Sequence, residues 1–342
     1  MPSVQLVGDP DFCIVGFGIA GATLALALDR HDARLRICDA NLDGASSRVA
    51  AGLITPVTGK NLKPQSDFEL LRQKAVDVYR SLEKETGKRF FFERSALRVL
   101  SEHKEISAYE KANADSLLRR YLRPTSFGTW PGVRDTGMPM EMVRAARLDT
   151  QTFLAAARHY LEAKHTFAGD VVETSNVPTV WCCGYREYET NRVPLLTWRP
   201  AKGEILKLDI DSQPFAGTVH ANGLWITPTA GTTALAGATY SWDVLDGTPT
   251  QSARASLVER LHLTLSSNFR VLDHFAGVRP IVAGRKPVIG PVDASPSQWL
   301  FNGLGSKGAL FAPSVAQQLA DHLVNGASIS SDYELKQRTS PP

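Results

Sequence analysis

The chain has 342 residues, of which 43% are hydrophobic, 21% charged and 8% aromatic, and this length corresponds to roughly two globular domains. Such a composition excludes a disordered, a collagen-like or a disulfide-framework protein. The formal net charge of +3 gives no overall nucleic-acid-binding signature, although a local basic patch is left open.

The first clear pattern runs from residue 12 to residue 39. A short apolar run, Phe12 to Val15, leads into a glycine-rich turn over 16–21. Ala22 to Leu28 strongly favours a helix, and Leu35 to Asp39 alternates as a strand does. The order and the length predict one βαβ unit.

Three helices are predicted next. The first covers 67–86, with a capping box at Ser66–Glu69 and a C-terminal stop at Gly87. A second is predicted at about 104–122, ended by a proline. The third begins at the cap Asp149 and runs to about residue 161.

The middle of the chain changes to a period of two. A buried strand is predicted at 177–183, and an antiparallel meander at 203–240 contains the hairpin turn Asn222-Gly223. A helix near 251–265 and a strand at 275–281 follow.

The last patterned segment combines a strand, a loop and a helix. Trp299-Leu300-Phe301 runs into the loop Gly303–Gly308, and the helix after it has Pro313 in its first turn and Gly326 beyond its end. The tail after about Ser328 is predicted to be loose.

The ends of the chain therefore look α/β and its middle looks like an antiparallel sheet. We predict a two-domain α/β (α+β) fold in which a Rossmann-like βαβ domain is interleaved with an antiparallel-sheet substrate domain. The first domain is expected to comprise 1–87, 145–200 and 268–330. The second is expected to comprise 88–144 and 201–267, which leaves 331–342 as a tail.

Cysteine usage and hydropathy indicate the cellular compartment in which the protein is expected. Cys13, Cys38, Cys182 and Cys183 show no C-x-x-C and no zinc spacing, which predicts buried free thiols in a reducing compartment. The longest uncharged stretch, 12–28, is too short and too rich in glycine for a membrane span, and no basic segment precedes it. We expect a soluble, cytoplasmic protein without membrane contact.

Gly16, Gly18 and Gly21 match G-x-G-x-x-G, the glycine spacing of dinucleotide-binding loops. The first glycine permits a tight turn, the second admits a pyrophosphate, and the third lets the helix pack on the strand. Asp39, at the end of the second strand, is suited to accept ribose hydroxyls. These residues predict a dinucleotide site without distinguishing FAD from NAD.

Two further features are open to more than one interpretation. The loop Gly303–Gly308 is either an anion-facing helix start, suited to negative charge on a flavin ring, or a tight strand-to-helix connection. Arg279 lies in an apolar strand, so its partner is either a structural acid, which the residues alone favour, or a substrate carboxylate. The eight histidines show no H-E-x-x-H motif and no i, i+4 pair, so no metal site is predicted.

Several motifs in order resemble the D-amino-acid oxidase (DAO) superfamily of FAD-dependent oxidoreductases, and within it glycine oxidase. The oxidase half of the bifunctional tRNA 5-methylaminomethyl-2-thiouridine biosynthesis protein is similar too. The motifs that carry the resemblance are Ile14 to Gly21 with Asp39, Gly44 to Pro56, Ala236 to Tyr240, Gly277 to Pro280 with Lys286 to Gly290, and Gly303 to Gly308 with Ala312-Pro313.

The resemblance implies a p-hydroxybenzoate-hydroxylase-like architecture and bound FAD. No cysteine follows Cys183, so the cysteinyl link of sarcosine-oxidase-like relatives is expected to be absent and FAD to be non-covalent. The residues that the resemblance implies as cofactor-binding are Gly16, Gly18, Ile19, Ala20, Gly21, Asp39, Ala40, Ser46, Ser47, Ala51, Gly52, Leu53, Gly184, Gly303, Gly305, Ser306, Lys307 and Gly308.

The same resemblance implies oxidation of the C–N bond of an amino acid or an N-substituted glycine, with hydride transfer to flavin N5. Arg279 matches the arginine that holds the substrate carboxylate, which reverses the preference for a structural partner. Trp225 stands where glycine oxidase has a carboxylate-binding tyrosine. Either Tyr240 compensates for this difference or the substrate differs, and Lys307 is expected to stabilise the reduced flavin.

Two alternatives stay open for the activity. One is an oxidase of carboxymethylaminomethyl groups on tRNA wobble uridines, which would need a basic surface. The other is a flavoprotein dehydrogenase that does not act on amino acids. The sequence specifies neither the amine, nor the electron acceptor, nor the oligomeric state.

Overall fold

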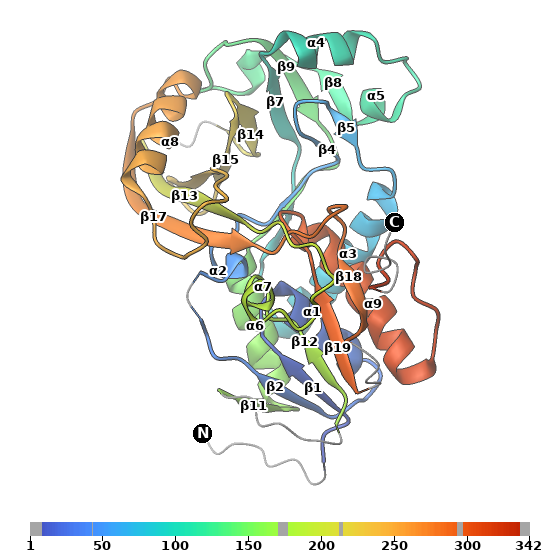
Figure 1. Cartoon of the computed structure of the whole chain (residues 1–342). Coiled ribbons are helices and arrows are strands. Elements are labelled where there is room, and N and C mark those ends of the chain that lie inside the picture. The colour runs from blue at the N-terminus through green and yellow to red at the C-terminus, as the bar shows by residue number, and fades with distance from the viewer. Residues whose placement is uncertain (1–8, 43, 170–176, 212–214, 293–296, 336–342) are drawn as a thin grey trace.

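The computed structural model describes residues 9–42, 44–169, 177–211, 215–292 and 297–335. Two large sheets dominate the molecule, a six-stranded sheet in the lower half of Figure 1 and an eight-stranded sheet in the upper half. This mixed α/β arrangement confirms the predicted fold class.

The six-stranded sheet is parallel except at one edge. Its strands, in spatial order, are β11 (Thr166–Ala168), β2 (Leu35–Cys38), β1 (Phe12–Val15), β12 (Thr179–Trp181), β19 (Gln298–Asn302) and the antiparallel β18 (Val288–Pro291). Because parallel strands end at the same edge of a sheet, the loops that follow β1, β2, β12 and β19 meet there. This edge therefore gathers the predicted loops at 16–21, 39–40, 184 and 303–308.

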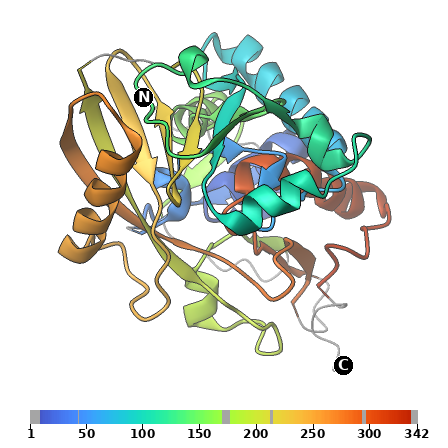
Figure 2. The same ribbon diagram turned by 90° about the horizontal axis from the view of Figure 1, so that it is seen from above.

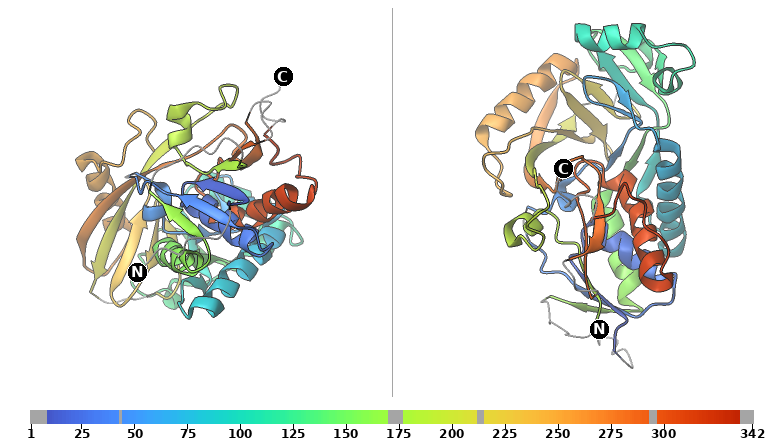
Figure 3. Two further views of the ribbon diagram at one scale, coloured as in Figure 1. Left: turned by 90° about the horizontal axis from the view of Figure 1, so that it is seen from below. Right: turned by 45° about the vertical axis from the view of Figure 1, so that its right-hand side comes forward.

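Four long helices pack together beside this sheet. They are α1 (Ile19–Asp29), α3 (Phe68–Thr86), α6 (Thr150–Glu162) and α9 (Gly308–Asn325). Helix α1 contacts β1, β2 and β19, α6 and α9 pack against α1, and α3 packs against both α6 and α9. The right-hand view of Figure 3 shows α3 in blue beside α9 in red. The fully buried Tyr79 of α3 joins them, since its hydroxyl donates to the carbonyl of Ala309 at 2.9 Å.

The C-terminal end of α1 is held by a buried carboxylate. Asp29 accepts hydrogen bonds from His165 Nε2 at 3.0 Å and from Lys164 Nζ at 3.0 Å. Burial opposes ionisation of Asp29, but the hydrogen bonds from His165 and Lys164 outweigh it, so the pKa of Asp29 is lowered.

Asp29→Asn is therefore expected to lower the free energy of unfolding at pH 7 by about 1–3 kcal/mol, because charge-assisted hydrogen bonds are lost. A carboxyl group whose pKa is lowered by folding stabilises the folded protein at pH values above the pKa that the group has in the unfolded chain. That contribution disappears as the pH falls through the folded-state pKa. Urea unfolding at several pH values should show the two proteins converging on acidification. Equal stability at pH 7 would contradict this assignment.

The eight-stranded sheet is antiparallel except where β14 pairs with β7. Its strands, in spatial order, are β17 (Phe269–Arg279), β13 (Ala201–Ile210), β16 (Thr233–Gly237), β15 (Leu224–Pro228), β14 (Val219–Ala221), β7 (Ala96–Leu100), β9 (Met138–Met142) and β8 (Leu122–Pro124). The predicted meander and its turn at Asn222-Gly223 are confirmed, and both turn residues have positive φ. Helix α8 (Gln251–Thr264, orange in Figure 2) packs on β13.

Shorter elements complete the described chain. The small strands are β3 (Leu53–Ile54), β4 (Val57–Thr58), β5 (Lys63–Pro64), β6 (Phe91–Glu93) and β10 (Ala146–Leu148). The short helices are α2 (Ser46–Val49), α4 (His103–Glu110), α5 (Leu117–Tyr121), α7 (Arg186–Thr190) and a 3₁₀ turn at Phe127–Thr129.

Four local predictions are wrong. Pro313 is not in the first turn of α9, because the helix begins at Gly308 and the proline lies in its second turn. The helix expected at 104–122 is two helices, α4 and α5, because the turn-forming residues between them interrupt it and Ser116 caps Arg119 to start α5. The capping box at Ser66–Glu69 does not form, since α3 begins at Phe68 without a side-chain cap. The tail is not loose up to residue 335, because Tyr333 and Leu335 are buried and pair with β18.

The division into two domains stays a proposal, with one change. Strand β17 was assigned to the first domain by the boundary at 268, but it pairs with β13 in the eight-stranded sheet. We propose to move this boundary to the end of β17, at about residue 280.

Candidate active site

One cavity of about 1910 Å³ opens between the strand ends of the six-stranded sheet and one face of the eight-stranded sheet. Its volume exceeds the 300–1,000 Å³ that is usual for a single small ligand. Of all the residues predicted for cofactor or substrate, only Gly21 does not line it. Elements from both ends of the chain thus build one site.

The first glycine-rich loop has the shape that the sequence predicts. Gly16 has φ +96°, and a Cβ there would lie 2.6 Å from the carbonyl oxygen of Cys182. A Cβ on Gly21 would lie 1.9 Å from the carbonyl oxygen of Gly16. Gly21 therefore allows α1 to pack on the loop, as its place in the motif predicts; it does not line the cavity, and its assignment as a cofactor contact stays a prediction.

Two helices begin at the cavity. Helix α1 starts after Gly18 and α9 starts after Lys307; neither N-cap residue caps its helix with its own side chain, and neither helix has an acidic residue in its first turn. Their first residues, Ile19 and Ala20 in α1 and Gly308 in α9, line the cavity. Exposed N–H groups and the helix dipoles suit an anion such as a pyrophosphate.

Asp39 lies directly after β2 and next to the glycine-rich loop. Its Oδ1 accepts the backbone N–H of Phe17 at 3.3 Å, and its Oδ2 lies 3.3 Å from Arg48 Nη2. The side chain is 13% exposed and lines the cavity. A carboxylate at this place is suited to accept ribose hydroxyls, as predicted.

Helix α2 and the segment after it form the side wall. The hydroxyl of Ser47 accepts the N–H of Ile19 at 3.1 Å, and a Cβ on Gly18 would lie 3.1 Å from the same hydroxyl. Gly52 has φ +66°, and a Cβ there would lie 1.9 Å from the carbonyl oxygen of Leu148. The positive φ of Gly52 and its contact with the Leu148 backbone require glycine there, whereas the contact at Gly18 is a close one with a side chain.

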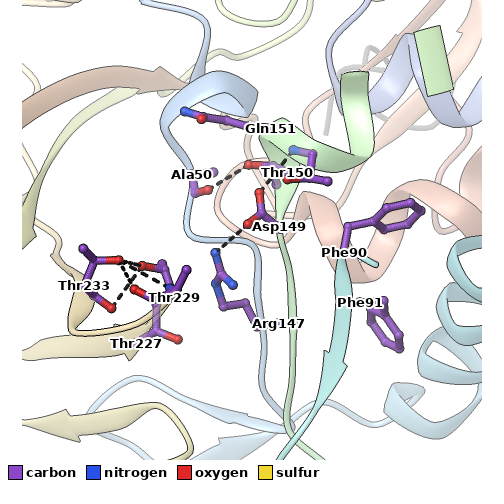
Figure 4. A network of polar contacts seen from close by, with 12 residues as sticks. Ala50, Phe90, Phe91, Arg147, Asp149, Thr150, Gln151, Thr227, Thr229 and Thr233 are labelled. Carbon is purple, nitrogen blue, oxygen red and sulfur yellow. Dashed lines mark hydrogen bonds and ion pairs between the residues drawn. The ribbon is translucent and has the colours of Figure 1, made fainter. Parts of the chain in front are cut away.

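The start of α6 holds this wall from behind. Figure 4 shows Thr150 donating its hydroxyl to the carbonyl of Ala50 at 2.8 Å, beside Asp149 and Gln151. Gln151 Nε2 donates to the carbonyl of Arg48 at 2.6 Å, and Asp149 caps α6 by accepting from the backbone N–H three residues on. The predicted cap at Asp149 is thereby confirmed, and it positions a wall of the cavity as well as starting a helix.

The loops after β12 and β19 are linked by one amide side chain. Asn302 Nδ2 donates to the carbonyl of Gly184 at 2.9 Å, and its Oδ1 accepts the N–H of Gly303 at 2.8 Å. Gly303 and Gly305 both have positive φ, which permits the sharp passage from β19 into α9. The residues Gly303, Gly305, Ser306 and Gly308 of this loop all line the cavity. This supports the interpretation of the loop as a helix start that faces an anion over that of a simple strand-to-helix connection.

Lys307 lies at the start of α9. Its Nζ donates to Gln65 Oε1 at 3.0 Å. Burial lowers the pKa of Lys307, although the charge of Asp67 opposes this. The side chain lines the cavity, and its assignment as a catalytic group stays a prediction.

The guanidinium of Arg279 is partly buried and packs against backbone and an aromatic ring. Its Nη1 donates to the carbonyls of Thr239 at 3.2 Å and Lys202 at 3.3 Å, and its Cζ lies 4.0 Å from the centre of the Tyr240 ring. Burial lowers the pKa of Arg279, although the electrostatic interaction with Tyr240 acts to raise it. Among the described residues no carboxylate pairs with it. A Cβ on Gly203 would lie 2.1 Å from Nη2, so the guanidinium extends over this glycine.

Tyr240 is carried by a loop that is tied to β13. Ser241 bridges Lys202 through two backbone hydrogen bonds, and the buried Nζ of Lys202 pairs with Asp246 at 2.6 Å. Tyr240 is 50% exposed, and its ring centre lies 6.1 Å from that of Trp242, which also lines the cavity. Tyr240 therefore packs against the carboxylate-binding candidate and forms part of the cavity mouth.

Trp225 lies on β15, in register with Gly237 of β16 and with its ring against that glycine. It lines the cavity on the same sheet as Arg279, two strands from the guanidinium. Its contact with a substrate stays a prediction.

Sequence reasoning did not identify Gly203, Arg48 or His220 as parts of the site. Gly203 could have been noticed, because a glycine inside a strand often marks the close approach of another group. His220 carries no motif, and only the register of β14 and β15 brings it to the cavity.

All four cysteines lie in the described residues, and none forms a disulfide. Burial raises the pKa of Cys182, and that of Cys183 to about 12, so both thiols at the cavity stay protonated at neutral pH. A protonated thiol is a poor nucleophile, which agrees with the prediction of non-covalent FAD.

No helix in the described part of the chain combines the length and the apolar character that crossing a lipid bilayer requires. No group of three or more His, Cys, Asp or Glu side chains there could hold a metal ion.

Comparison with known proteins shows the family to which the chain is similar. The family model described as DAO, FAD dependent oxidoreductase, matches residues 11–322. A glycine oxidase of Pseudomonas putida is 27% identical over 196 residues, which cover 56% of this chain and 48% of that protein. The chain thus matches about half of the length of this relative.

Solved structures show the same fold. Glycine oxidase from Bacillus cereus superposes with a TM-score of 0.82 at 17% identity, over 98% of this chain and 99% of that one. Iminodiacetate oxidase from Chelativorans sp. superposes with a TM-score of 0.73 at 20% identity, over 93% and 96%.

Proposed function

Because the chain belongs to the DAO family of FAD-dependent oxidoreductases, we propose that it oxidises the carbon–nitrogen bond of an amino acid or an N-substituted glycine. FAD, when bound, supplies an acceptor for two electrons and a proton as a hydride. The two helix N-termini and Asp39 are the groups suited to hold its pyrophosphate and ribose.

The partly buried guanidinium of Arg279, which has no acidic partner among the described residues, is the observation on which the proposal depends. A buried cation without an acidic partner is unfavourable, and it becomes favourable when an anion binds. Two N–H groups of a guanidinium match the two oxygens of a carboxylate. A carboxylate ligand in this cavity would therefore complete the charge balance that the described residues leave open.

The role of the protein is then mainly to position the substrate. Arg279 holds the carboxylate, the Tyr240 ring packs against the guanidinium, and the tie between Lys202 and Asp246 keeps the tyrosine loop in place. Hydride loss from the carbon beside nitrogen of the neutral amine leaves a protonated imine, and addition of water to that carbon releases a 2-oxo acid and an amine that keeps the proton. An amine that arrives unprotonated needs no side-chain base. Positioning of this kind contributes much of the rate in such reactions.

Anaerobic mixing of the holoenzyme with a panel of amines tests the proposal. We expect glycine, sarcosine, proline or a D-amino acid to bleach the yellow colour, while the matched amines without a carboxylate leave it unchanged. The measurement is the absorbance of the bound flavin over time. If no amino acid bleaches it, the protein is a flavoprotein dehydrogenase for another substrate class. Bleaching confined to modified tRNA would favour the RNA-directed alternative.

A further inference from the structure

A row of side chains crosses the cavity-facing side of the eight-stranded sheet. Residues that lie opposite one another on neighbouring strands point to the same face. Arg98 of β7 pairs with His220 of β14, His220 with Trp225 of β15, and Trp225 with Gly237 of β16. Gly237 pairs in turn with Ile205 of β13, and Ile205 is two residues from Gly203, the glycine over which the Arg279 guanidinium extends.

The two ends of this row lie far apart. The guanidinium of Arg279 extends over Gly203 on β13, and His220 is on β14, three strands further along the sheet. Neighbouring strands are 4.7–4.9 Å apart, so the separation along the sheet is about 14 Å. Glycine has one carbon between its carboxylate and its nitrogen, so it cannot reach from one end to the other.

The far end holds polar atoms that lack partners among the described residues. The Nε2 of His220 and the Nε of Arg98 are both buried without a hydrogen bond. Both residues line the cavity. A buried polar group without a partner costs free energy, and a ligand atom that bonds to it recovers that cost.

The net charge at this end is close to zero. Arg98 Nη2 pairs with Glu105 Oε1 at 2.6 Å, and these side chains are 11% and 8% exposed. Burial and the neighbouring Arg98 lower the pKa of His220 to about 3, so its imidazole is neutral at physiological pH. An uncharged oxygen acceptor suits these groups better than a second carboxylate does.

We propose that the substrate is an extended amino acid or N-substituted glycine, with its carboxylate on Arg279 and an uncharged oxygen, such as an amide carbonyl, at His220 and Arg98. This inference rests on the proposed function, because it takes Arg279 as the carboxylate site. His220 is then a residue that determines specificity for the far end of the substrate.

Inert ligands test the proposal on the holoenzyme. Alkoxyacetates carry an ether oxygen in place of the amine, so they bind without being oxidised, and the shift of the flavin absorbance reports their dissociation constants. The series has increasing chain length and three different ends: a primary amide, the isosteric isopropyl group, and a carboxylate.

At the chain length that spans the cavity, the amide-ended ligand is expected to bind about tenfold more tightly than the isopropyl-ended ligand, as for one recovered buried hydrogen bond. His220→Leu should reduce this preference to less than threefold and leave the affinity for methoxyacetate unchanged. His103→Leu, at the exposed start of α4 outside the cavity, should keep the full preference.

Three results would overturn the inference. They are equal binding of the amide and isopropyl ends at every length, a preference that survives in His220→Leu, and tightest binding by the carboxylate-ended ligand. Failure of methoxyacetate itself to bind would instead count against the proposed function and its carboxylate site.

Discussion

Arg279→Ala is expected to leave the protein folded and yellow and to weaken binding of methoxyacetate by about 2–5 kcal/mol, which is about 30-fold or more. The reason is that the guanidinium contacts only backbone carbonyls and the Tyr240 ring among the described residues, so its charge is available for a ligand. Titration of the flavin absorbance measures the loss.

Arg279→Lys is the matched control for this experiment. It keeps the positive charge but cannot present two parallel N–H groups, so an intermediate affinity is expected. Thermal unfolding of the apoproteins provides the second readout, and Arg279→Ala should unfold at or above the temperature of the wild type, because a partly buried cation is removed. An unfolded Arg279→Ala protein would show that Arg279 is a structural ion-pair member and that the carboxylate site is wrong.

Gly16→Ala is expected to destabilise the apoprotein by about 3 kcal/mol or more and to abolish the yellow colour of the purified protein. The new Cβ would lie 2.6 Å from the carbonyl oxygen of Cys182, and the φ of +96° is strained for alanine. Relief of this contact must separate β1 from the segment after β12, which deforms the loop that leads into α1. Calorimetry and the ratio of flavin to protein absorbance measure the two effects.

Gly231→Ala is the control for backbone strain alone. Gly231 also has positive φ, but a Cβ there meets nothing within 4 Å, and the residue does not line the cavity. We expect a cost of about 1–2 kcal/mol and full retention of FAD. A yellow Gly16→Ala protein with normal stability would contradict the assignment of this loop to the pyrophosphate.

Local sequence was sufficient for much of the cofactor side of the cavity. The spacing of Gly16, Gly18 and Gly21 predicts a turn whose steric demands depend mainly on neighbouring backbone, and the positive φ of Gly16 is as expected. The same holds for the end of α3, where Gly87 adopts the left-handed conformation that stops a helix. The predicted helix over 104–122 failed for an equally local reason, because turn-forming residues separate α4 from α5 in its middle.

The role of Arg279 could not be derived from its own neighbourhood. An apolar strand with one arginine requires an anion, but whether an acid of the chain supplies it depends on which strands lie beside it. Strand β13, whose Gly203 makes room for the guanidinium, is far from β17 in sequence and next to it in the sheet. The same is true of His220, which meets Arg98 only through the pairing of β14 with β7.

Composition, glycine spacing and strand period thus determined the fold class and the shapes of the glycine-rich loops, because steric and hydrogen-bonding demands act over a few neighbouring residues. Only the tertiary structure decided that Arg279 lacks an acidic partner among the described residues and that His220 and the Arg98–Glu105 ion pair lie three strands further along the same sheet. Charge pairing and burial depend on distances between strands, and those distances are set by the register of the whole sheet.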